Sequence, residues 1–322
     1  MMTDLQTAAL LREQDRFLIL THIRPDGDTI GSAAGLCAAL RQMGKEAYAL
    51  PNPGVTRHFA PYLTPYIAPE EYRPSFILSV DTASTNLIQK NGLALLGQID
   101  LAIDHHISYE MYAKEACVDA SCAACGELIY RIAVALGPLT REIALPLYMA
   151  IATDTGCFQY SNTTSATHRI AAALMDTGID YRGVNKIHFR TKSLRRMQLE
   201  GKLVETMSFF EDGAIAVSAI TLSLLEQLGA TEEDAEDLAS IPGQIEGVQA
   251  AVTIREQRDG GVKISLRTMT EYVNASAVCA LLGGGGHAAA AGCTTSGTVE
   301  DAKAAMLQAI VQVRREAASS GR

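Results

Sequence analysis

The chain has 322 residues, of which 48% are hydrophobic and 20% charged, and its formal net charge is −9 with a pI near 5.3. This length and composition predict two globular domains with buried cores. A net negative surface repels a long phosphate backbone, which argues against binding of long duplex nucleic acid. No apolar run reaches the roughly 18 residues of a membrane span, and the N-terminus lacks a secretory signal. The sequence therefore predicts a cytoplasmic protein without membrane contact.

The seven cysteines indicate neither a disulfide framework nor a zinc site. Cys122 and Cys125 form a lone C-x-x-C pair, with no second pair and no nearby histidine to complete a tetrahedral site. The favoured interpretation is that they are two small residues at the start of a helix.

The first 190 or so residues alternate short apolar segments with helix-like segments. This alternation predicts a mostly parallel sheet with helices on both faces, in which ligands bind at the carboxyl ends of the strands. The predicted strands are 17–21, 47–50, 76–80 and 101–103, and the predicted helices are 29–43, 121–136 and 143–153.

A basic segment follows, because residues 181–199 contain six Lys or Arg residues and no Asp or Glu. It is expected to be helical from Ser193 onward, either as a solvated face or as a guide for an anionic substrate. Beyond it, strands at 214–220, 248–254 and 262–266 and a terminal helix at 300–315 predict a smaller α/β domain. The expected division is a catalytic domain at 1–189, a basic linker helix at 190–211 and a substrate-binding domain at 212–322.

Acidic and imidazole side chains follow several of the predicted strands and one buried helix. The loop after the first strand reads HIRPDGDTIGS, and capping the next helix needs only one oxygen, for which Asp28 or Thr29 would suffice. His22 and Asp26 are then left for ligand binding. The full set at these positions is His22, Asp26, Asp28, Asp81, Asp104, His105, His106 and Asp154, the last expected in a loop.

Carboxylates and imidazoles without thiolates suit a divalent ion such as manganese, magnesium or cobalt. Six ligands are too many for one ion that keeps a position open for water. The natural count is two ions that share a carboxylate, an arrangement that stabilises the attacking and leaving oxygens of phosphoryl transfer.

The blocks HIRPDGDTIGS, VDT (80–82), DHH (104–106) and TDTG (153–156) resemble the four motifs of the DHH phosphoesterase superfamily. The tail GGGGHAAAAG (283–292), with SLR at 265–267, resembles the C-terminal domain associated with that family. The resemblance covers nearly the whole chain and is greatest to the nanoRNase/pAp phosphatase (NrnA-like) group.

The resemblance implies a role for each matching residue, with the active site in a cleft between the domains. One ion, most readily Mn²⁺, would be held by His22, Asp26 and Asp81, and the other by Asp28, Asp81, His105 and Asp154. His106 would donate to the scissile phosphate or the leaving oxygen, and Asp104 would orient the neighbouring histidine or loop. The substrate would be held in the second domain by Arg267, Gly284, Gly285, Gly286 and His287. A flexible turn would explain the glycines alone, but not Arg267 and His287.

The implied function is hydrolysis of 3′-phosphoadenosine 5′-phosphate (pAp) to AMP and phosphate, with degradation of RNAs of two to five nucleotides to mononucleotides. An alternative is a phosphodiesterase for cyclic or linear dinucleotides. A RecJ-like exonuclease is less favoured, because no additional nucleic-acid-binding fold is visible, and a family II pyrophosphatase would lack the glycine-rich tail. The non-enzymatic alternative, a nucleotide-sensing module, would be expected to lack a metal ligand. A homodimer is compatible with the resemblance.

Overall fold

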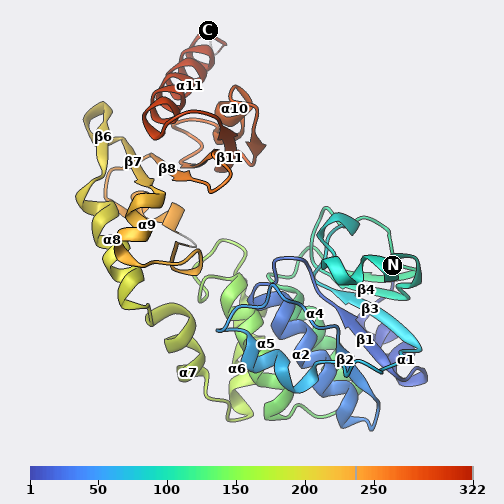
Figure 1. Ribbon diagram of the computed structural model, residues 1–322. Coiled ribbons are helices and arrows are strands. Elements are labelled where there is room, and N and C mark those ends of the chain that lie inside the picture. The colour runs from blue at the N-terminus through green and yellow to red at the C-terminus, as the bar shows by residue number, and fades with distance from the viewer. Residues whose placement is uncertain (236–237, 321–322) are drawn as a thin grey trace. The chain divides into compact units, whose positions relative to one another are not determined.

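The computed structural model describes residues 1–235 and 238–320. The chain divides into two compact units, Met1–Thr191 and Lys192–Arg322 (Figure 1). The predicted linker segment lies mostly in the second unit, as helix α8 (Leu194–Glu205) and strand β6 (Ser208–Phe210). Ser193 caps α8 by accepting a hydrogen bond from the Arg196 N–H, which explains where the helix begins.

The first unit is built on a sheet of five parallel strands, which confirms the predicted fold class. The strand order is β2 (Ala47–Ala49), β1 (Phe17–Leu20), β3 (Phe76–Val80), β4 (Leu101–Asp104) and β5 (Glu115–Val118). The sequence analysis missed β5, because this edge strand is short and only its two central residues are buried.

The two faces of this sheet are covered differently. Phe17 and Ile19 of β1 face a large core with the main helices, whereas Leu18 and Leu20 face a smaller cluster that includes residues of a 3₁₀ segment, Lys90–Gln98. The helices of the unit are α1 (Asp4–Glu13), α2 (Gly27–Gln42), α3 (Ala60–Leu63), α4 (Cys125–Leu136), α5 (Arg141–Asp154), α6 (Ser165–Asp176) and α7 (Tyr181–Asn185).

Two helix boundaries differ from the prediction in ways that matter for the site. Helix α4 begins at Cys125, because residues before it form a turn in which the Asp119 side chain accepts hydrogen bonds from the N–H and hydroxyl of Ser121. Helix α5 continues to Asp154, so this residue ends a helix instead of lying in a loop. The helical hydrogen bonds of α5 extend this far because the Thr155 N–H donates to the Ile151 carbonyl at 3.1 Å.

Helices α2 and α5 pack closely through a stripe of glycines on α2 (Figure 1). A Cβ at Gly31 would lie 2.3 Å from the Pro146 carbonyl oxygen, and one at Gly27 would lie 2.1 Å from the Thr153 Oγ1. Only glycine allows this separation. The stripe thereby sets the distance between the start of α2 and the end of α5.

The second unit contains a mixed sheet of six strands, ordered β10-β11-β9-β8-β7-β6. Its further strands are β7 (Ile215–Ile220), β8 (Ala250–Glu256), β9 (Val262–Thr268), β10 (Gly285–Gly286) and β11 (Ala290–Thr295). Strands β7 and β8 are parallel, and the other pairs are antiparallel. Gly260, with φ of +87°, lies in the β8–β9 hairpin turn.

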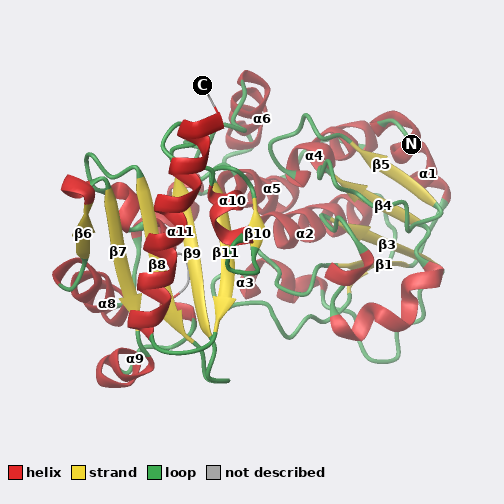
Figure 2. Ribbon diagram, turned by 90° about the horizontal axis from the view of Figure 1, so that it is seen from above, coloured by secondary structure: helices red, strands yellow, loops and turns green. Residues whose placement is uncertain are grey.

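Helices cover one face of this second sheet. In Figure 2, α11 (Val299–Ser320) crosses the sheet beside α10 (Ala275–Ala280), and apolar residues of β7, β8 and β9 pack beneath them. Helices α8 and α9 (Leu222–Leu228) form a separate apolar cluster with Ile220. Among the described residues, no helix combines the length and hydropathy needed to cross a bilayer.

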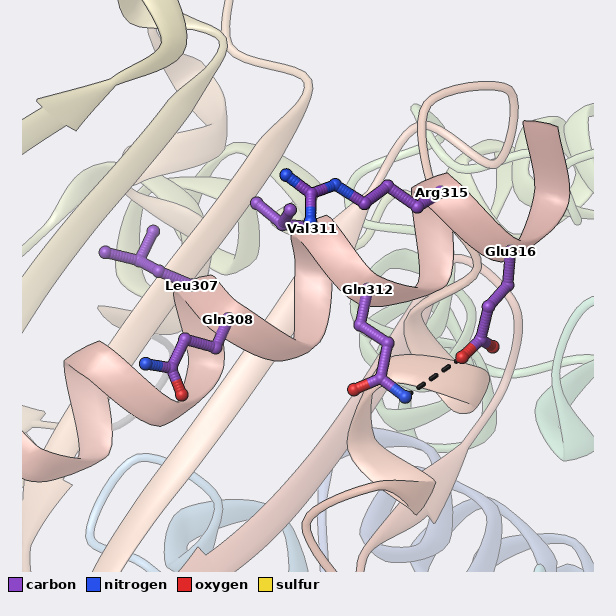
Figure 3. Close-up of a pocket in the computed structure, with 6 residues that line it drawn as sticks. All are labelled: Leu307, Gln308, Val311, Gln312, Arg315 and Glu316. Atoms are coloured by element: carbon purple, nitrogen blue, oxygen red, sulfur yellow. Dashed lines mark hydrogen bonds between the residues drawn. The ribbon is translucent and has the colours of Figure 1, made fainter. Parts of the chain in front are cut away.

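A groove of about 640 Å³ lies along the outer side of α11 (Figure 3). Its lining comes from this single helix: Leu307, Gln308, Val311, Gln312, Arg315 and Glu316. The Gln312 side chain donates to Glu316 at 2.9 Å. Among the described residues, the groove contains no group of potential metal ligands.

We predict that Gly31→Ala destabilises the first unit by about 1–3 kcal/mol, because the added methyl group forces α2 away from α5. The matched control is Gly97→Ala, since a Cβ at Gly97 meets no atom within 4 Å. The control is expected to change stability by less than about 0.5 kcal/mol. Urea unfolding of both variants measures the difference, and equal midpoints would contradict the proposed packing constraint.

Candidate metal centre

Seven Asp and His side chains from several segments of the first unit meet near the carboxyl ends of β1, β3 and β4. Their possible ligand atoms fall into groups within 4.8 Å: His22, Asp26 and Asp81; Asp28, His105 and Asp154; and Asp81, His105 and His106. The structure therefore brings together all the residues that the sequence analysis proposed as metal ligands.

The first group lies at the start of α2. The Nε2 of His22 is 3.6 Å from Asp26 Oδ1 and 3.8 Å from Asp81 Oδ2. Asp26 is also the N-cap of α2 and accepts from the Thr29 N–H at 3.1 Å. The sequence argument that left capping to Asp28 or Thr29 is therefore wrong, since one carboxylate both caps the helix and faces His22. Burial opposes the charged form of Asp26, but His22 outweighs it and lowers the pKa of Asp26.

Asp28 is held by the first turn of α4, a helix distant in sequence. Its Oδ2 accepts from the Cys125 N–H at 2.6 Å, and its Oδ1 accepts from the Gly126 N–H at 2.9 Å. Ala124, at the N-cap of α4, has no side chain that can cap the helix. Asp28 satisfies these amides instead, and the C-x-x-C segment contributes backbone donors in place of thiolates.

His105 lies at the centre of the second group. Its Nδ1 is 3.2 Å from the Cys122 carbonyl oxygen, which leaves Nε2 facing three carboxylates. Nε2 lies 3.4 Å from Asp81, 3.6 Å from Asp28 and 3.7 Å from Asp154. Burial alone would lower the pKa of His105, but the nearby carboxylates, first Asp81, outweigh it and raise that pKa to about 10.

Asp81 joins the two groups, with Oδ2 toward His22 and Oδ1 toward His105. Its backbone is in the left-handed region, with φ of +51°, an unusual conformation for a residue other than glycine. The Asp81 N–H donates to the Ile103 carbonyl at 2.9 Å, which ties this turn to β4. Oδ1 is buried without a hydrogen-bond partner among the described residues.

The four carboxylates of this cluster outnumber its three imidazoles. Burial, followed by the neighbouring carboxylates, raises the pKa of Asp28 well above its usual value. Burial likewise raises the pKa of Asp154 to about 6. Buried carboxylates with an unpartnered oxygen require a cation nearby. The donor set therefore fits a divalent metal centre.

Asp104, for which the sequence predicts a role in orienting the neighbouring histidine or loop, lies at hydrogen-bond distance from His106. The fully buried Asp104 carboxylate lies 2.7 Å from His106 Nδ1 through Oδ1, which also accepts the backbone N–H groups of both histidines. The hydrogen bond to Asp104 is the main cause of the raised pKa of His106. Because Asp104 engages Nδ1, His106 is better suited to donate through its other nitrogen than to bind metal through Nδ1.

Asn162 is a supporting residue to which the sequence analysis assigned no specific contact. Its Nδ2 lies 3.0 Å from the Ala123 carbonyl and 3.1 Å from the Asp154 carbonyl, so it connects the segments before α4 and after α5. No local pattern could have shown this contact. His188 lies outside the cluster: it stacks on Phe59 at 5.2 Å, and burial lowers its pKa to about 4.

The proposed substrate residues lie in the second unit, in β9 and the β10–β11 hairpin. A Cβ at Gly284 would lie 2.2 Å from the Gly292 carbonyl oxygen, so the close strand approach itself requires glycine. Gly286 has φ of +146°. Arg267 and His287 are exposed, and neither side chain has a hydrogen-bond or ion-pair partner among the described residues.

Comparison with known proteins agrees with this arrangement. The model for the DHH family, N-terminal domain, matches residues 16–151, and the model for the DHHA1 domain matches residues 212–316. The chain therefore belongs to the DHH family of phosphoesterases, in the form that carries a DHHA1 domain, and the resemblance found in the sequence is confirmed.

Two relatives indicate which group within the family this chain resembles. The chain is 34% identical over 307 residues to the bifunctional oligoribonuclease and PAP phosphatase NrnA of Thermus thermophilus, covering 94% of this chain and 90% of that protein. The protein of the same name from Bacillus subtilis is 28% identical, covering 86% of this chain and 88% of its own length. An exopolyphosphatase-related protein from Bacteroides fragilis has the same fold, with a TM-score of 0.85 at 24% identity, over 97% of this chain and 96% of its own.

We predict that binding of Mn²⁺ releases protons at neutral pH. The raised pKa of His105, about 10, means that its ring is protonated at neutral pH. An imidazole must lose this proton before it can bind a metal. Affinity for Mn²⁺ is therefore expected to rise from about pH 6 to about pH 8. Calorimetry in buffers of different ionisation enthalpy measures the released protons, and Asp81→Asn corrects for heats unrelated to the site. Heats that do not depend on the buffer would contradict this assignment.

Proposed function

We propose that the chain is a two-metal phosphoesterase that hydrolyses pAp to AMP and phosphate and degrades very short RNAs to mononucleotides. The observation that carries the proposal is the meeting of His22, Asp26, Asp28, Asp81, His105 and Asp154 around the unpartnered Asp81 Oδ1. The activities for which the two NrnA relatives are named support the choice of substrates.

The proposed ligand sets are His22, Asp26 and Asp81 for one divalent ion, and Asp28, Asp81, His105 and Asp154 for the other. The two oxygens of Asp81 face different groups, which supports its role as the shared ligand. Manganese is the favoured ion, with magnesium or cobalt as alternatives, because the donors are carboxylates and imidazoles. The nearby Cys125 thiol supports this choice, since it donates to the Ile103 carbonyl at 3.4 Å.

Bound divalent ions supply charge stabilisation to the phosphoryl oxygens and lower the pKa of the attacking water. The chain's own contribution is positional. Cys125 and Gly126 orient Asp28 through their N–H groups, and the Cys122 carbonyl orients His105. Asp104 holds the His106 ring by Nδ1, so that Nε2 is left to donate to the scissile phosphate or the leaving oxygen.

We assign Arg267, Gly284, Gly285, Gly286 and His287 to holding the substrate away from the reacting phosphate. The exposed, unpaired guanidinium of Arg267 can grip a phosphate through two parallel hydrogen bonds. A short ligand needs few such contacts, which is consistent with the net charge of −9. All seven cysteines are free thiols, which supports a reducing, cytoplasmic location.

We predict that the Mn²⁺-loaded protein releases phosphate from pAp, and that Asp81→Asn lowers the rate by at least about a hundredfold. Asparagine tolerates the left-handed backbone at this position, so the variant is expected to fold. Phosphate release and metal content are measured together. Loss of activity with full retention of metal would contradict the role of Asp81 as the shared ligand.

The same assay separates the proposed function from its alternative. No release of phosphate from pAp, combined with turnover of a cyclic dinucleotide, would assign the chain to the dinucleotide phosphodiesterases.

We predict that Arg267→Ala raises KM for pAp by about tenfold to a hundredfold and leaves metal content unchanged, because a charge-assisted contact contributes about 1.5–3 kcal/mol. The matched control is Arg258→Ala, which removes the same charge from an exposed position at the β8–β9 turn. Loss of metal from the Arg267 variant would place this residue outside the substrate site.

A further inference from the structure

A cavity of about 290 Å³ lies on the sheet of the second unit and extends from Arg267 along strands β8 and β9. Lys263, Ser265 and Arg267 alternate along β9 and line it. The residues between them, Ile264 and Leu266, are buried in the core with α10 and α11. Since side chains alternate along a strand, the cavity lies on the face opposite these helices.

Strand β8 adds a second row to this face. Arg255 pairs with Lys263, and Thr253 pairs with Ser265. Directly opposed residues of antiparallel strands share a face, so two cations and two hydroxyls lie in adjacent rows. Arg255, Thr253, Ser265 and Lys263 all line the cavity, with Leu238 among its apolar residues.

The cations of the cavity differ in how well the chain compensates their charge. Arg255 forms an ion pair with Glu232. Lys263 and Arg267 are exposed and have no hydrogen-bond or ion-pair partner among the described residues. Among the described residues, the cavity therefore presents two positive charges without a partner, although the chain as a whole carries a net charge of −9. This local excess of positive charge favours an anionic ligand.

The hydroxyls indicate what kind of anion fits. Thr253 Oγ1 lies 3.2 Å from Ser218 Oγ, whereas the Ser265 hydroxyl has no partner among the described residues. Ser265 lies midway between Lys263 and Arg267 on the same strand. Lys, Arg and Ser are the side chains that contact phosphate oxygens in nucleic-acid complexes. At Lys263, the ammonium group would neutralise the charge of a bound phosphate, and the Ser265 hydroxyl would donate a hydrogen bond to it.

The spacing favours two phosphates over one. Lys263 and Arg267 are four residues apart on a strand, so their Cα atoms are about 13 Å apart. We propose that Lys263, with Ser265, forms a second phosphate subsite that binds an internucleotide phosphate of short RNA, beyond the phosphate held at Arg267. This subsite rests on the proposed function and deepens it, because it gives the enzyme a contact that a mononucleotide such as pAp cannot make.

The test compares Lys263→Ala with the wild-type protein on pAp and on a trinucleotide. We expect KM for the trinucleotide to rise about tenfold and KM for pAp to stay within about twofold, with Lys263→Arg close to wild type. Arg258→Ala is the control for loss of one positive charge from the same hairpin. Equal effects of Lys263→Ala on both substrates, or no effect on either, would overturn the proposal.

A binding measurement makes the result independent of catalysis. A trinucleotide in which one linkage is a neutral methylphosphonate lacks one phosphate charge. Calorimetry measures the affinity of each such analogue. Lys263→Ala is expected to weaken binding of the fully charged trinucleotide, but not of the analogue that is neutral at the contacted linkage. If Lys263→Ala weakened binding equally whichever linkage was neutral, the subsite would be refuted even in an active enzyme. Absence of hydrolysis with discrimination intact would instead refute the proposed function alone.

Discussion

The arrangement of the first unit depends on the burial of several carboxylates around one imidazole. Asp28, Asp81 and Asp154 approach the Nε2 of His105, and their mutual repulsion in a site shielded from water is only partly offset by that ring. Such a cluster is stable as a charged set only when further positive charge is present. The family to which the chain belongs is metal-dependent, and the buried, unpartnered oxygen of Asp81 is the point at which this requirement is clearest.

The surrounding helices act as a rigid frame for this cluster. The glycine stripe of α2 brings Asp28 close to α5, which ends at Asp154, and the first amides of α4 fix both oxygens of Asp28. The Asp28 carboxylate is thus held by backbone groups of an element other than its own. This support leaves few rotamers open, so the ligands are organised before an ion binds, which reduces the conformational entropy lost on binding.

The second unit follows a different electrostatic design. One face of its sheet packs against α10 and α11, and on the other face Lys263 and Arg267 have no partner among the described residues. The positive charges of the second unit lie along strand β9, whereas the negative charges of the first unit are clustered around His105. A point of carboxylates suits metal ions and the reacting phosphate, and a row of cations suits the remaining phosphates of a short chain. In the proposed function, the first unit supplies the chemistry and the second holds the ligand.

The sequence by itself determined the parallel sheet, the smaller α/β second domain and the identity of the clustered residues, because strands ending in Asp or His are visible in local patterns. It did not determine that Asp26 caps α2 or that Asp154 ends a helix, since capping geometry depends on the actual backbone path. Only the tertiary structure decided that the C-x-x-C segment holds Asp28 through amides and that Asn162 joins two loops. These contacts join residues far apart in the chain, and no local periodicity encodes them.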